Sequence, residues 1–354
     1  MAELNLVLAG QQPLDKEEKK AARMFDLSKA IREAGQGGVI SGLEKEMHDE
    51  GAKELRNLSG VVGNLFIPSM LIQRAYKRAG EDTKTTGASY GNIPTMVGAE
   101  GLVVANPLYR QLGATVYEGL TAGKLDLPFS KGHSAAAVAE TSEASQSVPT
   151  RAKGTLSATR FQGWQNYTQE YLSESVVMPS LMADMIQSID RGVGKSLVSD
   201  AIAVAVISGF ETSGTAAALT WNTLLDIIAA TISDNFISEG FVLSKELFYQ
   251  LAATERTSAN GKYLLEGGTG KNKGSIFGID AFGTSFLPVH DTNKYDIVYG
   301  DWKESYVGFW GGVQLLVDPY TASDNGYVKL TWSRMGAVDS NPYAFASKRN
   351  ASIS

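Results

Sequence analysis

The sequence contains no cysteine, which excludes disulfide bonds, thiolate metal ligands and cysteine nucleophiles. It has three histidines, His48, His133 and His290, and none has a second histidine at the spacing of a metal site. The most apolar stretch, residues 197–210, contains Asp200 and is shorter than the roughly 18 residues of a membrane-spanning helix. The formal charge of −6 also leaves no excess of lysine and arginine for coating nucleic acid. We therefore expect a soluble, acidic protein with no cofactor, no metal and no membrane contact.

The chain does contain enough apolar surface for a substantial core. Hydrophobic residues make up 43% and charged residues 20% of the 354, a composition that excludes wholesale disorder. The length sets a prior of about two domains.

Residues 1–60 are densely charged, and their apolar positions recur at helical spacing on both sides of the Gly35-Gln36-Gly37-Gly38 break. We expect two amphipathic helices there. They either pack on the body through a narrow apolar stripe or form a detachable or partner-binding arm. Mixed charge with a thin stripe fits both interpretations, and we favour the arm. Residues 80–107 are rich in glycine, threonine and serine, so we expect a long irregular loop.

A long β-hairpin is expected at residues 121–160. Leu125, Leu127 and Phe129 alternate with polar or proline positions, and small or apolar residues alternate again from Ala152 to Ala158. A two-stranded hairpin is at best marginally stable in water. The hairpin therefore needs another surface, either on the same chain or on a neighbouring subunit, and we expect it to lie on an adjacent subunit.

The rest of the chain has both helical and strand patterns, which predicts an α+β fold. Pro179 opens the strongest helical pattern, which runs to Ser208. A second helix is expected at 223–236, and Ser244 is the expected N-cap of a third, directly after the short strand 241–243. The remaining strands are expected at residues 276–282, 295–299, 306–310, 313–317 and 327–334.

Two short motifs are typical of enzymes but lack the context that the chemistry needs. Gly87-Ala88-Ser89-Tyr90-Gly91 matches a nucleophile elbow, yet no apolar strand precedes it. The glycine-rich run 267–271 lacks the first glycine and the final serine or threonine of a phosphate-binding loop. We predict no active site and no enzyme, and keep as an alternative a serine hydrolase that pairs Ser89 with His133 or His290.

The order of several short segments carries a resemblance. They are Leu125-Asp126-Leu127-Pro128, Ala139-Glu140, 168–172, 240–244, Asn260-Gly261-Lys262-Tyr263-Leu264, Tyr299-Gly300-Asp301-Trp302 and Asp318-Pro319-Tyr320. On these residues the chain resembles the major capsid proteins of tailed double-stranded DNA phages, over residues 60–345. The resemblance implies the HK97-like capsid fold.

The resemblance also implies a division of the chain. The expected parts are a charged helical N-terminal region at 1–60, an N-arm and the start of the peripheral domain with an inserted loop at 61–120, the E-loop hairpin at 121–160, the peripheral domain with the spine helix at 161–209, the axial domain at 210–312, and the completion of the peripheral domain at 313–354.

The function implied is that of a structural subunit of an icosahedral capsid. The subunit would self-assemble into hexamers and pentamers that enclose double-stranded DNA without sequence-specific binding. Its partners would be itself, a portal, a scaffold or maturation protease and decoration proteins, and it would assemble in the host cytoplasm and reside in the virion. An encapsulin-like nanocompartment shell, which encloses protein cargo, is the second alternative.

We expect the hairpin to carry the contacts between subunits, and no catalytic, cofactor or metal residues. In family members whose shells become covalently cross-linked, a lysine follows the Ala-Glu pair of the hairpin; here Thr141 follows Ala139-Glu140, so no such bond is expected. The candidate contact residues are Lys124, Asp126, Lys131, His133, Glu140, Thr141, Glu143, Arg151 and Lys153.

Overall fold

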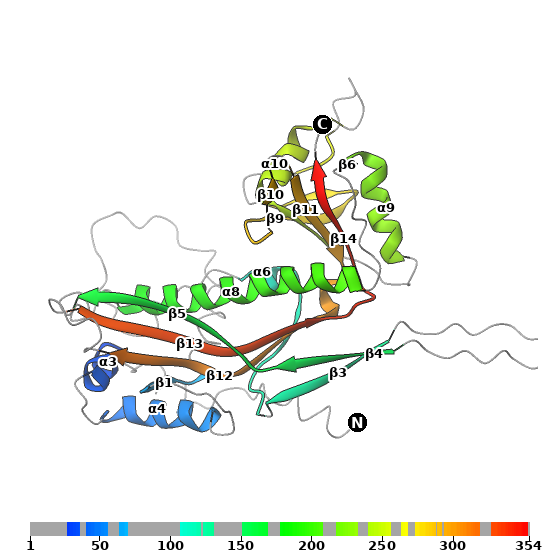
Figure 1. The fold of residues 1–354 in the computed structure, drawn as a ribbon. Coiled ribbons are helices and arrows are strands. Elements are labelled where there is room, and N and C mark those ends of the chain that lie inside the picture. Colours follow the sequence, from blue (N-terminus) through cyan, green and yellow to red (C-terminus); the bar gives the residue numbers. More distant parts are fainter. Residues whose placement is uncertain are drawn as a thin grey trace, which may run out of the picture.

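The computed structural model contains two large sheets with a long helix between them, and a separate two-stranded sheet (Figure 1). It describes residues 27–35, 40–55, 64–69, 107–121, 123–130, 151–168, 178–207, 217–232, 240–255, 263–267, 273–287, 289–291, 294–318 and 327–352. Residues 80–106 of the expected loop, the motif around Ser89, and His133 lie outside these residues.

The first sheet has five strands in the order β1-β12-β13-β5, with β2 pairing beside β12. Their bounds are β1 Leu65–Ile67, β2 Thr115–Tyr117, β5 Thr159–Thr168, β12 Ser305–Asp318 and β13 Tyr327–Ser340. The sequence predicted separate strands at 306–310 and 313–317, which was wrong. They form the single strand β12, whose register against β13 shifts at a bulge between Trp310 and Gln314. Gly311, with φ of 65°, is in the left-handed region at this bulge.

The long helix α8 spans Met178–Ile207 and lies along one face of the first sheet (Figure 1). The expected helix from Pro179 to Ser208 is thus confirmed to within one residue at each end. Its apolar stripe is buried, and the Trp332 indole donates to the Ser188 hydroxyl at 2.6 Å. The short helix α6, Leu108–Gln111, is joined to α8 by the Tyr109 hydroxyl, which donates to Asp190 at 3.0 Å.

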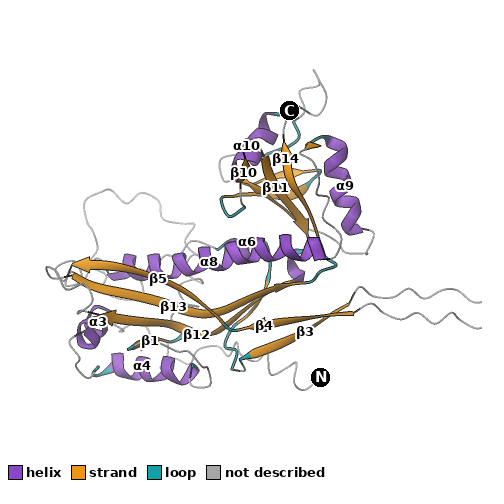
Figure 2. Cartoon of the chain, in the orientation of Figure 1, coloured by secondary structure: helices purple, strands orange, loops and turns teal. Residues whose placement is uncertain are grey.

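Helices α3 (Leu27–Gly35) and α4 (Leu43–Glu54) cover the opposite face of the first sheet (Figure 2). Ile31 and Met47 are buried in the same core as the sheet. Both helices and the break between them were expected. The detachable arm favoured by the sequence is not observed for residues 27–35 and 40–55, because Ile31 and Met47 of the stripe are buried in the body.

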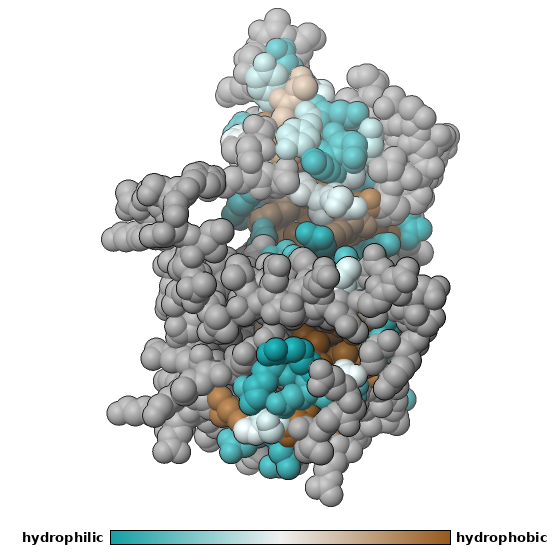
Figure 3. All heavy atoms as spheres, turned by 90° about the vertical axis from the view of Figure 1, so that its left-hand side faces the viewer, coloured by the Kyte–Doolittle hydropathy of each residue, from teal (hydrophilic) through white to brown (hydrophobic). Residues whose placement is uncertain are grey.

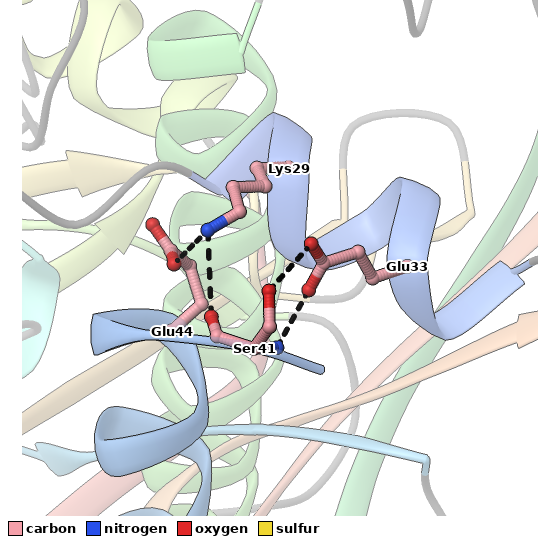
Figure 4. Close-up of polar contacts among 4 residues, drawn as sticks. All are labelled: Lys29, Glu33, Ser41 and Glu44. Carbon is pink, nitrogen blue, oxygen red and sulfur yellow. Dashed lines mark hydrogen bonds and ion pairs between the residues drawn. The ribbon is translucent and has the colours of Figure 1, made fainter. Parts of the chain in front are cut away.

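Polar contacts also join α3 to Ser41 and to the first turn of α4 (Figure 4). Lys29 Nζ lies 2.8 Å from Glu44 Oε2, and the amide and hydroxyl of Ser41 donate to Glu33 at 2.7 and 3.0 Å. The two bonds from Ser41 lower the pKa of Glu33.

Seen from the end of the molecule on the left of Figure 1, a group of hydrophilic residues in the lower body is bordered by hydrophobic ones (Figure 3).

The second sheet has seven strands in the order β6-β14-β11-β7-β9-β8, with β10 pairing beside β11. Helices α9 (Trp221–Ile232) and α10 (Lys245–Ala253) pack on it, and the Leu247 amide donates to the Ser244 hydroxyl, which confirms the expected N-cap. The strands are β6 Ala217–Ala218, β7 Gly240–Ser244, β8 Lys273–Ile276, β9 Ile279–Thr284, β10 Val289–Asp291, β11 Lys294–Gly300 and β14 Phe345–Ser352.

The prediction of a single strand at 276–282 is wrong. This segment is the turn and second strand of a hairpin formed by β8 and β9, and its two turn residues, Phe277 and Gly278, have φ of 57° and 81°. Two positive φ values match the twist of a two-residue hairpin turn. Phenylalanine is an unusual residue there, and its ring packs on Trp221 with centroids 3.9 Å apart.

The chain crosses between the two large sheets three times: between β5 and β6, between β11 and β12, and between β13 and β14. The last two crossings are not where we expected. β12 belongs to the first sheet from Ser305 onward, so a boundary at residue 312 falls inside a continuous strand. β14, which the sequence assigned to the completion of the first body, belongs to the second sheet. Trp302 lies at one crossing, donates to the Gly240 carbonyl at 2.9 Å and packs edge-on against Phe345. Within the described residues, no helix combines the length and the apolar character needed to cross a membrane.

Candidate assembly surfaces

The base of the expected hairpin is a separate two-stranded sheet. β3 (Lys124–Ser130) pairs with β4 (Arg151–Ser157) in antiparallel register, from Lys124 opposite Ser157 to Ser130 opposite Arg151. Figure 1 shows these strands extending from the end of the first sheet, beneath α8.

One face of the hairpin base is buried on its own chain. Leu127, Phe129 and Leu156 form a cluster with Trp310, Met335 and Ala337 of the first sheet, and the Phe129 and Tyr306 rings stack at 5.7 Å. Gly154 has no room for a side chain, because a Cβ there would lie 2.3 Å from the Phe129 ring. Of the two surfaces that the sequence left open, the base therefore lies on the same chain. Contact of residues 131–150 with an adjacent subunit stays a prediction.

The other face of the base carries charged residues that pair with each other. Lys153 Nζ lies 2.8 Å from Asp126 Oδ2, and the Thr155 hydroxyl donates to Asp126 Oδ1 at 2.9 Å. The bonds from Lys153 and Thr155 lower the pKa of Asp126. Both charged side chains are more than half exposed, so the pair adds little to stability but fixes where the charges stand.

The structure describes four of the nine candidate contact residues. Lys124, Asp126 and Lys153 are exposed on the hairpin base, and Arg151 stands in β4 opposite Ser130. The other five lie outside the described residues: Lys131, His133, Glu140, Thr141 and Glu143.

A groove of about 460 Å³ opens where β4, β5, α8 and β13 meet. Hydroxyl groups and one carboxylate line it, from Thr155, Ser157, Thr159, Ser196, Ser199 and Asp200. Burial raises the pKa of Asp200 to about 7, and the charge of Asp339 adds to the rise, while hydrogen bonds from Ser340 act in the opposite direction. The sequence showed only that Asp200 interrupts an apolar stretch; nothing in it indicated a groove.

Large hydrophobic side chains are exposed in both bodies. Trp164 on β5 is 61% exposed, with Lys329 Nζ 5.0 Å from the centre of its ring. Leu225 of α9, Tyr249 of α10 and Tyr263 are each more than 40% exposed on the second body. Residues of this kind are enriched at protein–protein interfaces.

Comparisons with solved structures show that the fold is a known one. The capsid of a native GTA particle matches with a TM-score of 0.51 at 15% identity, over 77% of this chain and 95% of that chain. A chain from Microbacterium phage Oxtober96 matches with 0.53 at 12%, over 75% and 96%, and one from Mycobacterium phage Bobi with 0.50 at 13%, over 76% and 97%. No curated protein matches the sequence.

The sequence itself matches a family model described as "Phage capsid family" over residues 99–347. This match includes the hairpin, α8, all of the second sheet except the end of β14, and the two long strands of the first. Neither the nanocompartment nor the hydrolase alternative gains support from the comparisons. Because the match covers well over half of the chain, this protein belongs to the phage capsid family: it is a structural subunit with the HK97-like fold and a component of the virion.

Proposed function

We propose that this capsid subunit assembles into hexamers and pentamers of a closed icosahedral shell, and that residues 131–150 of the hairpin bind an adjacent subunit. The observation that carries the proposal is the anchoring of the hairpin base by Leu127, Phe129 and Leu156 on the sheet of its own chain. A hairpin held at its base offers contact residues at a defined position to a second copy. Contacts between two different surfaces of identical subunits close into rings when the rotation allows.

The register of the base gives a direct test. Ser130 lies opposite Arg151, so a two-residue Asn-Gly turn can replace residues 131–150 without disturbing β3 or β4. We expect this variant to fold and unfold like the wild type and to form no shells in negative-stain microscopy. A control with a Gly/Ser segment of the original length distinguishes lost side chains from lost length. Normal shells from the Asn-Gly variant would refute the proposal.

The exposed ion pair of the hairpin base gives a second test. Exchanging the two charges, as Asp126→Lys with Lys153→Asp, keeps the pair within the subunit but reverses the charges that a neighbour meets. Because exposed ion pairs contribute only about 0–1 kcal/mol, the free energy of unfolding should hardly change. Assembly should be weakened, as measured by sedimentation, whereas unaltered assembly would remove Asp126 and Lys153 from the contact residues.

The second sheet corresponds in this proposal to the axial domain and the first to the peripheral domain. Exposed Tyr249 and Tyr263 would then face copies around a ring axis. Tyr249→Lys should leave the subunit folded and reduce the yield of rings. The comparison is Tyr343→Lys, at a partly buried position on the connection to β14. It separates an effect of Tyr249 on ring formation from a general effect of replacing a tyrosine by lysine.

The content and further partners of the shell follow from the same proposal. We expect double-stranded DNA inside, held without sequence-specific contacts, since the acidic chain of net charge −6 does not attract phosphates. A portal, a scaffold or maturation protease and decoration proteins complete the expected partners, with assembly in the host cytoplasm. Nuclease-resistant DNA in purified particles supports this content, and protein cargo without DNA contradicts it.

A further inference from the structure

Two carboxyl groups from distant parts of the chain meet where the hairpin base joins the body. Asp200 stands on α8 and lines the groove described above, and Asp339 stands near the end of β13. The negative charge of Asp339 acts on Asp200, so the two groups are electrostatic neighbours.

Asp339 holds the hairpin directly. Its carboxylate accepts the backbone N–H of Thr155 in β4. The same carboxylate oxygen would lie only 2.5 Å from a Cβ added at Gly154, which is too close for a side chain there. The backbone of β4 is therefore seated against this side chain, with no space between them.

Asp200 is largely buried, and only one of its two carboxyl oxygens has a hydrogen-bond partner among the described residues. Ser340 provides hydrogen bonds to its carboxyl group, and the Ser340 hydroxyl also lies 3.0 Å from that of Ser305. The second oxygen, Oδ2, is buried and has no hydrogen-bond partner among the described residues. A buried oxygen in this position favours the protonated carboxyl group, because the charged form is poorly solvated.

Among the residues that the structure describes, no cation acts on the pKa of Asp200. From β13 the neighbour is Asp339, which is itself acidic; from β4, β5 and α8 the groove residues are hydroxyls and apolar groups. Arg160 lies between Thr159 and Phe161, which both line the groove, so by strand alternation it belongs to the other face of β5. On the hairpin, Lys153 forms an ion pair with Asp126, and Lys124 is exposed. The carboxylate of Glu304, which precedes β12, accepts a hydrogen bond from the side chain of Asn341, the residue after β13.

We propose that Asp200 and Asp339 form a proton-controlled latch: a proton on Asp200 keeps the base of the hairpin seated against β13, and loss of that proton loosens it. Both carboxylates are charged once the proton is lost, and they then repel each other. This repulsion acts at the place where the Thr155 N–H of β4 donates to Asp339. The latch belongs to the single subunit and does not depend on the proposed rings.

The direction of the effect follows from linkage. Burial raises the pKa of Asp200 to about 7, and burial also raises that of Asp339. If the junction opens, Asp200 meets water and its pKa returns toward 3.8. The closed junction therefore binds the proton more tightly than the open one. Closure is most favourable below about pH 3.8, where Asp200 is protonated in both states, becomes less favourable as the pH rises through about 7, and does not change further at higher pH.

Hydrogen exchange of the full chain at pH 6 and pH 8.5, corrected for intrinsic rates, tests the latch. Protection of residues 151–157 should fall by about tenfold at the higher pH, since pH 6 lies one unit below a pKa of about 7 and one pKa unit is a factor of ten in equilibrium. Asp200→Asn should protect this segment equally at both pH values. Asp126→Asn, which removes an exposed carboxylate from the same hairpin, should keep the wild-type pH dependence.

Asp339→Asn keeps an acceptor for Thr155 but removes the neighbouring charge. It should move the midpoint of opening to lower pH, and it is the test that remains if Asp200→Asn does not fold. Equal wild-type protection at the two pH values would overturn the proposal, as would an unchanged pH dependence in Asp200→Asn or an unmoved midpoint in Asp339→Asn.

Discussion

The side chain of Asn64 forms hydrogen bonds with both the backbone carbonyl and the backbone N–H of Val317. Its Nδ2 donates to the Val317 carbonyl at 3.1 Å, and its Oδ1 accepts the Val317 N–H at 2.9 Å. The amide thus takes the place of one more residue of β1, which begins at Leu65 and pairs with β12. A side chain that completes a strand pairing in this way joins the N-terminal part of the chain to β12, one of the two longest strands of the first sheet.

Asn64→Ala removes both bonds and leaves the edge of β12 unpaired. We expect the free energy of unfolding to fall by about 1–3 kcal/mol, the usual cost of unsatisfied backbone groups. Urea unfolding of the full chain measures this change. Asn166→Ala, at an exposed position on β5, is the matched control and should change stability by less than about 0.5 kcal/mol. Equal effects of the two substitutions would contradict the role of Asn64.

Gly312 lies where β12 passes closest to the strand β1. A Cβ added there would stand in the place of the Ile67 carbonyl oxygen, so only a shift of the backbone could make room. We expect Gly312→Ala to destabilise the protein by more than about 2 kcal/mol, as overpacking of a rigid site does. The control is Gly123→Ala, where an added Cβ meets nothing within 4 Å. If both alanines are tolerated equally in thermal unfolding, the close approach at Gly312 does not hold.

His48 of α4 joins the helix to β1 as a neutral ring. The Phe66 N–H donates to its Nδ1 at 3.2 Å, and the two rings lie 5.2 Å apart. Burial lowers the pKa of His48 from 6.5, although Asp49 acts in the other direction. The folded state therefore binds the proton less tightly than the unfolded state, and stability is lost as the pH falls below about 6.5.

His48→Asn keeps an acceptor close to the Nδ1 position but does not titrate. The loss of unfolding free energy between pH 7.5 and pH 5 should be smaller in this variant than in the wild type. Urea unfolding at the two pH values makes the comparison, in which every other titrating group is common to both proteins. A loss of the same size in both would rule out His48 as its source.

The shell should not be covalently cross-linked through the hairpin. Thr141 follows Ala139-Glu140, and its hydroxyl cannot supply the amine of an isopeptide bond. Lys131 and Lys153 are also on the hairpin, but a displaced lysine would miss an acceptor placed for the original position, since bond formation needs reacting atoms within roughly 3–3.5 Å. Boiled particles should give a single band near 37.9 kDa on a denaturing gel. A ladder of larger species would show that a cross-link forms.

Local sequence patterns were enough to predict those helices, strands and caps whose pattern is complete within a few residues. The apolar stripe of α8, the alternation of β3 and β4, and the capping hydroxyl of Ser244 each report a geometry that repeats within one or two turns or pleats. The same patterns failed where one residue changes the path of the chain, as at Gly311 in β12 and at Phe277-Gly278 between β8 and β9. A bulge and a tight turn both interrupt a strand without interrupting its apolar character.

The candidate site was predicted only in part, for a related reason. The sequence named Asp126 and Lys153 as contact residues, and the register of the hairpin brings them together as a pair. It gave no sign that Asp339 would hold Thr155, or that Asp200 would lie beside them, because these residues are far apart in the chain.

By itself, the sequence determined which residues are buried and in what local conformation, since hydrophobic periodicity depends on the geometry of a single helix or strand. Only the tertiary structure decided what covers each buried face. β13 joins the first sheet and β14 the second although they follow one another in the chain, and α3 and α4 lie on the body and not apart from it. The physical reason is that strand pairing and helix docking are chosen by hydrogen bonds and packing between distant segments, which leave no periodic trace in either segment alone.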